Sequence, residues 1–220
     1  MHMARTCVAV VVMAALGAVP AMAQDESHVT VDSASGSLDL VVGYLPGEEG
    51  FSIGADRHLL LDGSIAVYDT VLTWPSGEFA GWQINRQFVL TSDFFASTGR
   101  LDGGDFAYEI LDISPVSGPE TIFAWGDVEG GLHNVARSDG ATRSDRSFEI
   151  GFDGHPEFQQ AFFRDPGLYD VTFQAWDQNG IYADSPTITV RYRSVPAPGS
   201  IGLLALGGTL LCRRRRRVSV

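Results

Sequence analysis

The chain has 220 residues, a formal net charge of −12, two cysteines and no lysine. All 27 acidic residues lie between Asp25 and Asp184, whereas only nine of the 15 basic residues lie in the segment 24–194, which therefore has a formal charge of −18. So acidic a segment repels nucleic acids and anionic lipids, which excludes both as its partners.

The positions of the two cysteines exclude several kinds of site. Cys7 and Cys212 both lie in terminal segments, so the segment 24–194 contains no cysteine. Disulfides, cysteine-ligated zinc and thiol catalysis are therefore excluded there. A segment of about 170 residues is long enough for one domain with a substantial hydrophobic core, and its stability has to come from that core.

Residues 1–23 have the organisation of a secretory signal peptide. Arg5 supplies the positive charge, residues 7–19 form the apolar region, and Ala21 and Ala23 form a small-residue cleavage site. Cleavage by signal peptidase leaves Gln24 as the new N-terminus. The alternative is an N-terminal membrane anchor, which the short apolar region and the cleavage site disfavour.

The segment 24–194 is predicted to be all-β, because short runs of β-branched and aromatic residues alternate with Gly, Pro, Asp and Asn. We expect strands at 28–31, 38–44, 64–74, 81–84, 88–91, 106–113, 121–125, 148–152, 169–176 and 187–192. The polar segment 132–147 is expected to be a long exposed loop. So many short strands favour an antiparallel β-sandwich, immunoglobulin-like or jelly-roll-like, flanked by a signal helix and a C-terminal hydrophobic helix.

The end of this domain has the clearest strand pattern. After an Asp-Pro-Gly turn at 165–167, apolar and polar residues alternate through residues 168–176, as in a half-buried strand. Tyr169 near its start resembles a tyrosine corner, whose hydroxyl binds an upstream turn. Asn179-Gly180 predicts a further turn. Because Ile188, Val190 and Tyr192 share one face of the next strand, we expect a hairpin that closes the sandwich.

Two loops contain candidate metal ligands. Asp153, His155 and Glu157 place three ligand types within five residues, although a solvated loop is the alternative, since ligands must also converge in space. The loop 102–105, Asp-Gly-Gly-Asp, is a candidate for calcium. It lacks the alternating oxygen ligands of a calcium-binding loop, so a hairpin turn is favoured. We therefore predict no cofactor, with calcium as the one alternative.

No catalytic motif is present in the segment 24–194. It has four histidines, which are His28, His58, His133 and His155. None of them stands in an HExxH pattern, and the chain has no Gly-x-Ser-x-Gly. We therefore predict that the protein is not an enzyme.

The four tryptophans allow two interpretations. They are Trp74, Trp82, Trp125 and Trp176. They could form a platform on which sugar rings stack, or they could fill the core and cover hairpins. A row of exposed rings would distinguish the first interpretation from the second.

The segment 118–192 is similar to the repeat of actinobacterial surface-anchored proteins of the choice-of-anchor type. The similarity lies in Gly154-His155-Pro156-Glu157-Phe158-Gln159-Gln160-Ala161-Phe162, in the Pro-Gly-Leu-Tyr at 166–169 and in the upstream Gly118-Pro119. Glu157 replaces the second histidine of that repeat, and Gln160 replaces its tryptophan. The resemblance implies a β-sandwich displayed on a cell surface.

The C-terminal segment 195–217 has three parts in a fixed order. Val195-Pro196-Ala197-Pro198 is followed by an apolar run at 201–212 and by five arginines, Arg213, Arg214, Arg215, Arg216 and Arg217. A membrane-spanning helix needs about 20 apolar residues, so this run spans a bilayer only marginally. The arginines would keep its end on the cytoplasmic side. A plain tail anchor and a basic tail that binds anionic lipid are the alternatives.

This arrangement resembles the PEP-CTERM sorting signal, which exosortase-type membrane enzymes recognise in Gram-negative bacteria. Val195, Pro196, Pro198 and the arginine cluster match the signal, and Ala197 stands where the family has glutamate. The resemblance implies export across the inner membrane, transient insertion through the C-terminal helix, and delivery to the cell surface or beyond.

Together these patterns predict an exported, non-catalytic protein of the cell surface or extracellular matrix, with signal peptidase and an exosortase-type enzyme as partners. The first alternative is a secreted module that binds polysaccharide or calcium. The second alternative is a secreted hydrolase, which would need convergent carboxylates or histidines in a pocket.

Overall fold

The computed structural model describes residues 27–195, apart from 35, 44–46, 71, 86–87, 92–100, 129–131 and 152–158. Within these residues the chain forms β-strands and one turn of 3₁₀ helix, η1 (Ser144–Arg146), so the predicted all-β class is confirmed. The expected signal helix and C-terminal helix lie outside the described residues. Among the residues described, no helix is long and apolar enough to cross a membrane.

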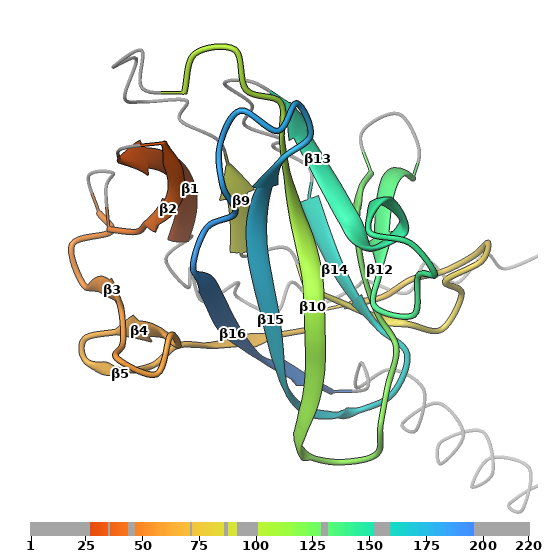
Figure 1. Cartoon of the computed structure of the whole chain (residues 1–220). Helices are drawn as coiled ribbons and strands as arrows, with labels where there is room; N and C mark the ends of the chain where they lie inside the picture. The colour runs from red at the N-terminus through yellow and green to blue at the C-terminus, as the bar shows by residue number, and fades with distance from the viewer. Residues whose placement is uncertain are drawn as a thin grey trace, which may run out of the picture.

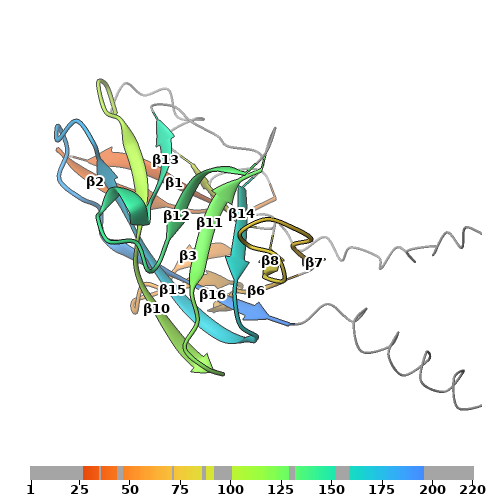
Figure 2. The same ribbon diagram turned by 90° about the vertical axis from the view of Figure 1, so that its right-hand side faces the viewer.

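Two five-stranded sheets make up most of the fold (Figure 1). Sheet I has the order β13 (Ser147–Gly151), β10 (Phe106–Ser117), β15 (Gly167–Asp177), β16 (Thr187–Ser194) and β6 (Val67–Asp69). Sheet II, seen in Figure 2, has the order β12 (His133–Arg137), β11 (Phe123–Asp127), β14 (Gln159–Phe163), β8 (Gln83–Asn85) and β7 (Leu72–Thr73). Neighbouring strands are antiparallel throughout both sheets, except that β6 runs parallel to β16.

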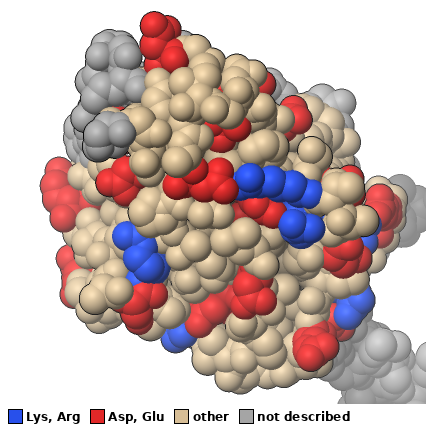
Figure 3. Space-filling view, in the orientation of Figure 1, with Lys and Arg blue, Asp and Glu red and all other residues tan. Residues whose placement is uncertain are grey.

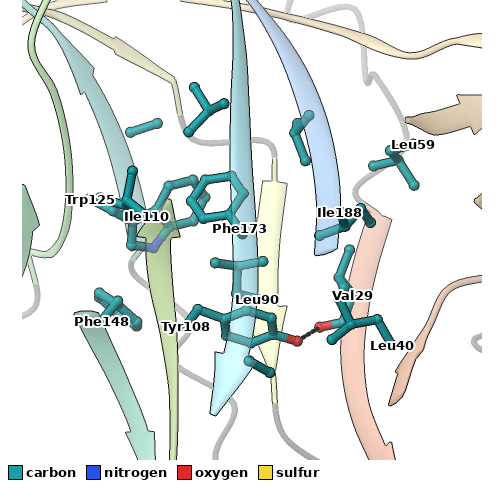
Figure 4. Close-up of a cluster of buried hydrophobic side chains, with 14 of the residues drawn as sticks. Val29, Leu40, Leu59, Leu90, Tyr108, Ile110, Trp125, Phe148, Phe173 and Ile188 are labelled. Carbon is teal, nitrogen blue, oxygen red and sulfur yellow. Dashed lines mark hydrogen bonds between the residues drawn. The ribbon is translucent and has the colours of Figure 1, made fainter. Parts of the chain in front are cut away.

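Two three-stranded sheets complete the described fold. One has the order β2 (Ser37–Val41), β1 (Ser27–Ala34) and β9 (Phe88–Thr91), and the other has the order β3 (Phe51–Ile53), β4 (Leu59–Leu61) and β5 (Ser64–Ile65). The first is tied to sheet I by the hydroxyl of Tyr108, which donates to the carbonyl of Val29 over 2.8 Å (Figure 4). Since Tyr108 is fully buried, this bond satisfies its polar tip inside the core.

Sheets I and II pack face to face through aromatic side chains. The alternation predicted for 168–176 is present: Val171, Phe173 and Ala175 of β15 are at most 1% exposed. From sheet II, the ring centroids of Phe123 and Trp125 lie 5.8 and 5.9 Å from that of Phe173, both edge to face. Such T-shaped pairs between two inner faces form the core that a sandwich requires.

The hairpin predicted at the end of the domain is confirmed. β15 pairs with β16 in register, and the inward residues Ile188, Val190 and Tyr192 are fully buried. The hydroxyl of Tyr169 donates to the carbonyl of Pro166 over 3.1 Å, which is the expected tie between the strand and its preceding turn. Gly167 is required there, because a Cβ on it would lie 2.5 Å from the Tyr169 hydroxyl.

The prediction of a long exposed loop at 132–147 is wrong. The segment contains β12, which pairs with β11 at the edge of sheet II, and the 3₁₀ turn η1. Ala136 is fully buried in the core, while most other residues of β12 are partly exposed. An edge strand needs few apolar residues because only part of its surface is covered, and this made it look like a loop.

The sequence patterns also miss β3, β4 and β14 and give the wrong strand at 64–74. The single strand expected at 64–74 is divided into β5, β6 and β7, which pair with three different partners, β4, β16 and β8. β14, in the middle of sheet II, was not predicted, because it begins with two glutamines. Gln159 is nevertheless buried: its side chain accepts from the indole of Trp125 over 3.0 Å and pairs with the backbone of Leu90.

Candidate functional site

The predicted metal ligands Asp153, His155 and Glu157 lie outside the described residues. Within the residues that the structure describes, no group of three or more His, Cys, Asp or Glu side chains is arranged to hold a metal ion.

The loop 102–105 begins in a turn closed by the Gly104 N–H and the Leu101 carbonyl, and two of its backbone oxygens accept from the neighbouring loop. The predicted hairpin is not shown, because the described partners of β10 are β13 and β15. The carbonyl of Asp102 accepts from the Tyr182 hydroxyl over 3.2 Å, and the carbonyl of Gly103 accepts from the Asn179 side chain over 3.0 Å. These contacts join the loop to the turn after β15.

Asp177, at the end of β15, holds the loop 102–105 and the turn after β15 together through hydrogen bonds to its carboxylate. Its carboxylate accepts hydrogen bonds from the backbone N–H groups of Asp105, Asn179, Ile181 and Tyr182, at 2.7 to 3.1 Å. Burial alone would raise the pKa of Asp177, but these four donors hold the pKa below its usual value. The residue therefore acts as a structural anchor.

A network of charged side chains lies on the outer face of sheet I. Asp170 forms a bidentate pair with Arg191, at 2.7 and 2.8 Å, and its Oδ2 is 3.2 Å from Nε2 of His58. The other ring nitrogen of His58 is 3.0 Å from Oδ2 of Asp56. The network connects the loop between β3 and β4 to two central strands of sheet I.

Both oxygens of the Asp170 carboxylate are engaged by Arg191 and His58. Burial alone would raise its pKa, but hydrogen bonds from Arg191 and then from His58 hold the pKa below its usual value. Both oxygens face the guanidinium in the fork geometry that Arg–carboxylate pairs favour. An anion so paired is poorly suited to act as a base or a cation ligand, so we interpret the network as structural.

A second ionic group on the same face surrounds Glu109. This carboxylate is 5% exposed and contacts two guanidinium groups: Oε2 is 2.8 Å from Nε of Arg143, and Oε1 is 2.6 Å from Nη2 of Arg146. Arg143 also contacts Asp184 at 2.7 Å and lies over the ring of Trp176, 4.2 Å from its centroid. In Figure 3 the arginines of this face lie against acidic side chains. The group fastens η1 to sheet I.

The three described histidines all face carboxylates. Besides His58, Nδ1 of His28 contacts the buried Glu48, and Nε2 of His133 lies 3.7 Å from Asp127. They belong to separate regions: His28 is on β1, while His133 is on the edge strand of sheet II and is 57% exposed. The structure therefore does not bring these histidines together into one site. The fourth, His155, lies outside the described residues.

The four tryptophans separate into two kinds. Trp125 is 1% exposed and belongs to the core, as the packing interpretation predicts. Trp74, Trp82 and Trp176 are half-buried. Trp176 is covered by Arg143, and its indole donates to the Ser147 hydroxyl over 2.9 Å. The remaining two stand together on one hairpin of sheet II, so the sugar-platform interpretation concerns this hairpin alone.

The Trp74–Trp82 hairpin forms a small second hydrophobic cluster on the outer face of sheet II. Phe79, Ile84, Ala124 and Phe162 are its buried members, and Trp74, Trp82, Val128, Leu132 and Val135 pack against them. Sequence reasoning identified the two tryptophans but not Phe79, whose neighbours Gly77, Glu78 and Ala80 are polar or small and read as a turn. An aromatic residue within a turn between two tryptophans is the signal that could have shown it.

Comparison with known proteins identifies no relative: no protein-family model, no curated protein and no solved structure matches this chain.

Proposed function

We propose that the chain is an exported, non-catalytic protein of the cell surface or extracellular matrix, sorted through its C-terminal segment. Residues 1–23 direct export, and signal peptidase removes them so that Gln24 becomes the N-terminus. An exosortase-type enzyme then recognises residues 195–217. The observation that supports this most is the order of the tail, Val195-Pro196-Ala197-Pro198, then an apolar run, then five arginines.

The point in the sequence at which β16 ends agrees with the proposal. β16 ends at Ser194, and Val195 is held by Thr70, whose hydroxyl accepts from the Val195 N–H over 2.9 Å. The sorting motif thus begins where the ordered pairing of β16 has just ended. A processing enzyme needs a substrate segment that is not engaged in a sheet, and the motif begins at the first residue after β16.

The fold type that we propose is a β-sandwich of the immunoglobulin-like or jelly-roll-like kind. The Tyr169 corner and the closing β15–β16 hairpin support the immunoglobulin-like form. The ionic groups around Asp170 and Glu109 have structural interpretations, and this supports a non-catalytic role over a secreted hydrolase.

The experiment is an intact-mass measurement on the protein recovered from the native cell surface. We expect a chain that begins at Gln24 and ends within 195–198, with any added mass identifying the anchor. A matched variant in which Arg213–Arg217 are replaced by serine should keep the tail and accumulate unprocessed. Recovery of the full tail, arginines included, from the wild-type cell surface would contradict the proposal and favour a plain tail anchor.

A further inference from the structure

The hairpin of β7 and β8 presents apolar side chains on a single face. Leu72 pairs with Ile84 and Thr73 pairs with Gln83. Beyond them lies a bulge, because the Trp74 N–H donates to the Trp82 carbonyl over 2.8 Å while the Trp74 carbonyl accepts from the Gly81 N–H over 2.9 Å. Residues directly opposite in an antiparallel pair point to the same side, with Cβ atoms about 5 Å apart. Both tryptophans pack against the cluster that contains Ile84, so they lie on the same side of the hairpin as Ile84.

Each of the two indole rings packs against a buried phenylalanine ring. The centroid of Trp74 lies 5.4 Å from that of Phe162 at an interplanar angle of 80°, and that of Trp82 lies 4.8 Å from that of Phe79 at 85°. Phe79 and Phe162 are buried and in turn contact each other at 5.1 Å. Rings fixed in this way lose little conformational freedom when they bind a ligand, which favours affinity.

The two tryptophans are partly exposed, in contrast to Trp125; Trp176 is partly exposed as well, but Arg143 lies over its ring. Leu72, on the same side of the hairpin, is 51% exposed. A pair of rigid, partly exposed indoles offers flat apolar surface together with N–H donors. The C–H faces of sugar rings match such surface, because they are flat and apolar while their edges carry hydroxyls.

Planar polar groups lie beside this surface. Arg137 has its guanidinium carbon 5.9 Å from the centroid of Phe79 and pairs with Glu78 and with Asp139. All three side chains are at least 32% exposed. Guanidinium and carboxylate groups can donate to and accept from hydroxyls in their own plane. A site of apolar rings with a few oriented polar groups is the usual composition of small-ligand sites.

We propose that the outer face of this hairpin, formed by Trp74 and Trp82 with Arg137, Glu78 and Asp139 beside them, binds a neutral polysaccharide. The formal charge of −18 on the segment 24–194 disfavours an anionic chain, and the mixture of indoles with ionic groups disfavours a purely apolar ligand. This proposal does not depend on how the tail is processed.

The experiment uses affinity electrophoresis and calorimetry on the exported chain with hydroxyethyl cellulose, dextran and galactomannan as neutral probes and alginate as the anionic one. We expect retardation by at least one neutral polysaccharide and none by alginate. Trp74→Ala and Trp82→Ala should each weaken that binding about tenfold or more, as loss of a stacking ring does. The matched control Trp176→Ala, on sheet I, should bind within about twofold of wild type, since its ring is not part of the site.

Because an alanine at either position could also loosen the hairpin, Trp74→Phe and Trp82→Phe are made as well, and each variant is checked by thermal unfolding. The phenylalanine variants should fold and bind with intermediate affinity. In the unaltered protein, the bound polysaccharide should shield tryptophan fluorescence from iodide. The proposal is overturned if no neutral probe binds, if alginate binds in preference, or if the tryptophan variants bind like wild type. A dimer in sedimentation that Trp82→Ala dissociates would overturn it too, by assigning the surface to a second copy of the chain.

Discussion

The outer faces of sheets I and II carry different kinds of side chain. On sheet I, charged side chains satisfy one another: Asp170 pairs with Arg191, and Glu109 pairs with Arg143 and Arg146. On sheet II, the outer face carries an apolar cluster, to which the edge hairpin β7–β8 contributes two partly exposed tryptophans. The paired carboxylates of Asp170 and Glu109 are largely buried and leave little capacity for a ligand, whereas partly exposed rings leave apolar surface to be covered. The proposed polysaccharide site depends on this difference.

The largest expected loss of stability comes from a substitution on the outer face of sheet II. Phe162→Ala removes a fully buried ring that supports both Trp74 and Phe79, so it leaves a cavity and loosens the hairpin. We expect the free energy of unfolding to fall by about 3–5 kcal/mol in chemical denaturation. Leu72→Ala is the control on the same hairpin; since Leu72 is 51% exposed, its effect should stay within about 0.5 kcal/mol. Equal effects would show that the hairpin contributes no packed core.

The next largest loss of stability is expected from a substitution on the outer face of sheet I. Glu109→Gln leaves Arg143 and Arg146 without their shared carboxylate, and the expected loss is about 2–3 kcal/mol, because a hydrogen-bonded charge is removed from a buried position. Asp184→Asn is the control: it pairs with the same Arg143 but is 42% exposed, so its effect should be at most about 0.5 kcal/mol. Both are measured by urea unfolding. A loss at Glu109 no larger than that at Asp184 would refute a structural role for the group.

The smallest effect is a pH dependence on the charged face. The pKa of Asp170 is lowered in the folded state, so its contribution to stability is complete above the unfolded-state pKa of about 4 and is lost as the pH falls through the folded value. Asp170→Asn should therefore reduce stability by about 1 kcal/mol at pH 7 and less at pH 3. Unfolding free energies measured between pH 3 and 7 test this. A variant that loses the same amount at every pH would indicate that the charge of Asp170 is not involved.

The sequence predicted β15 and β16 of sheet I because these strands follow simple alternation. Residues 168–176 and the following strand have one apolar and one polar face, and local pattern decides such strands. The tyrosine corner was predictable for the same reason, since Tyr169 stands next to its own turn.

Sheet II was harder to predict because its contacts are long-range. The burial of Gln159 depends on Trp125 and on Leu90, which are far from it in the sequence. Similarly, β5, β6 and β7 form one continuous stretch but pair with three different strands. No local pattern contains that information.

The difference between the two faces is tested most directly by residue-resolved oxidative footprinting of the wild-type protein. The protein is labelled with hydroxyl radicals, with and without saturating neutral polysaccharide, and the oxidation of each tryptophan is quantified by mass spectrometry. Bound polysaccharide should lower the oxidation of Trp74 and Trp82 severalfold and leave that of Trp176 unchanged. Protection of Trp176, or unchanged oxidation of Trp74 and Trp82 in a sample that demonstrably binds the polysaccharide, would contradict the assignment of the binding face to sheet II.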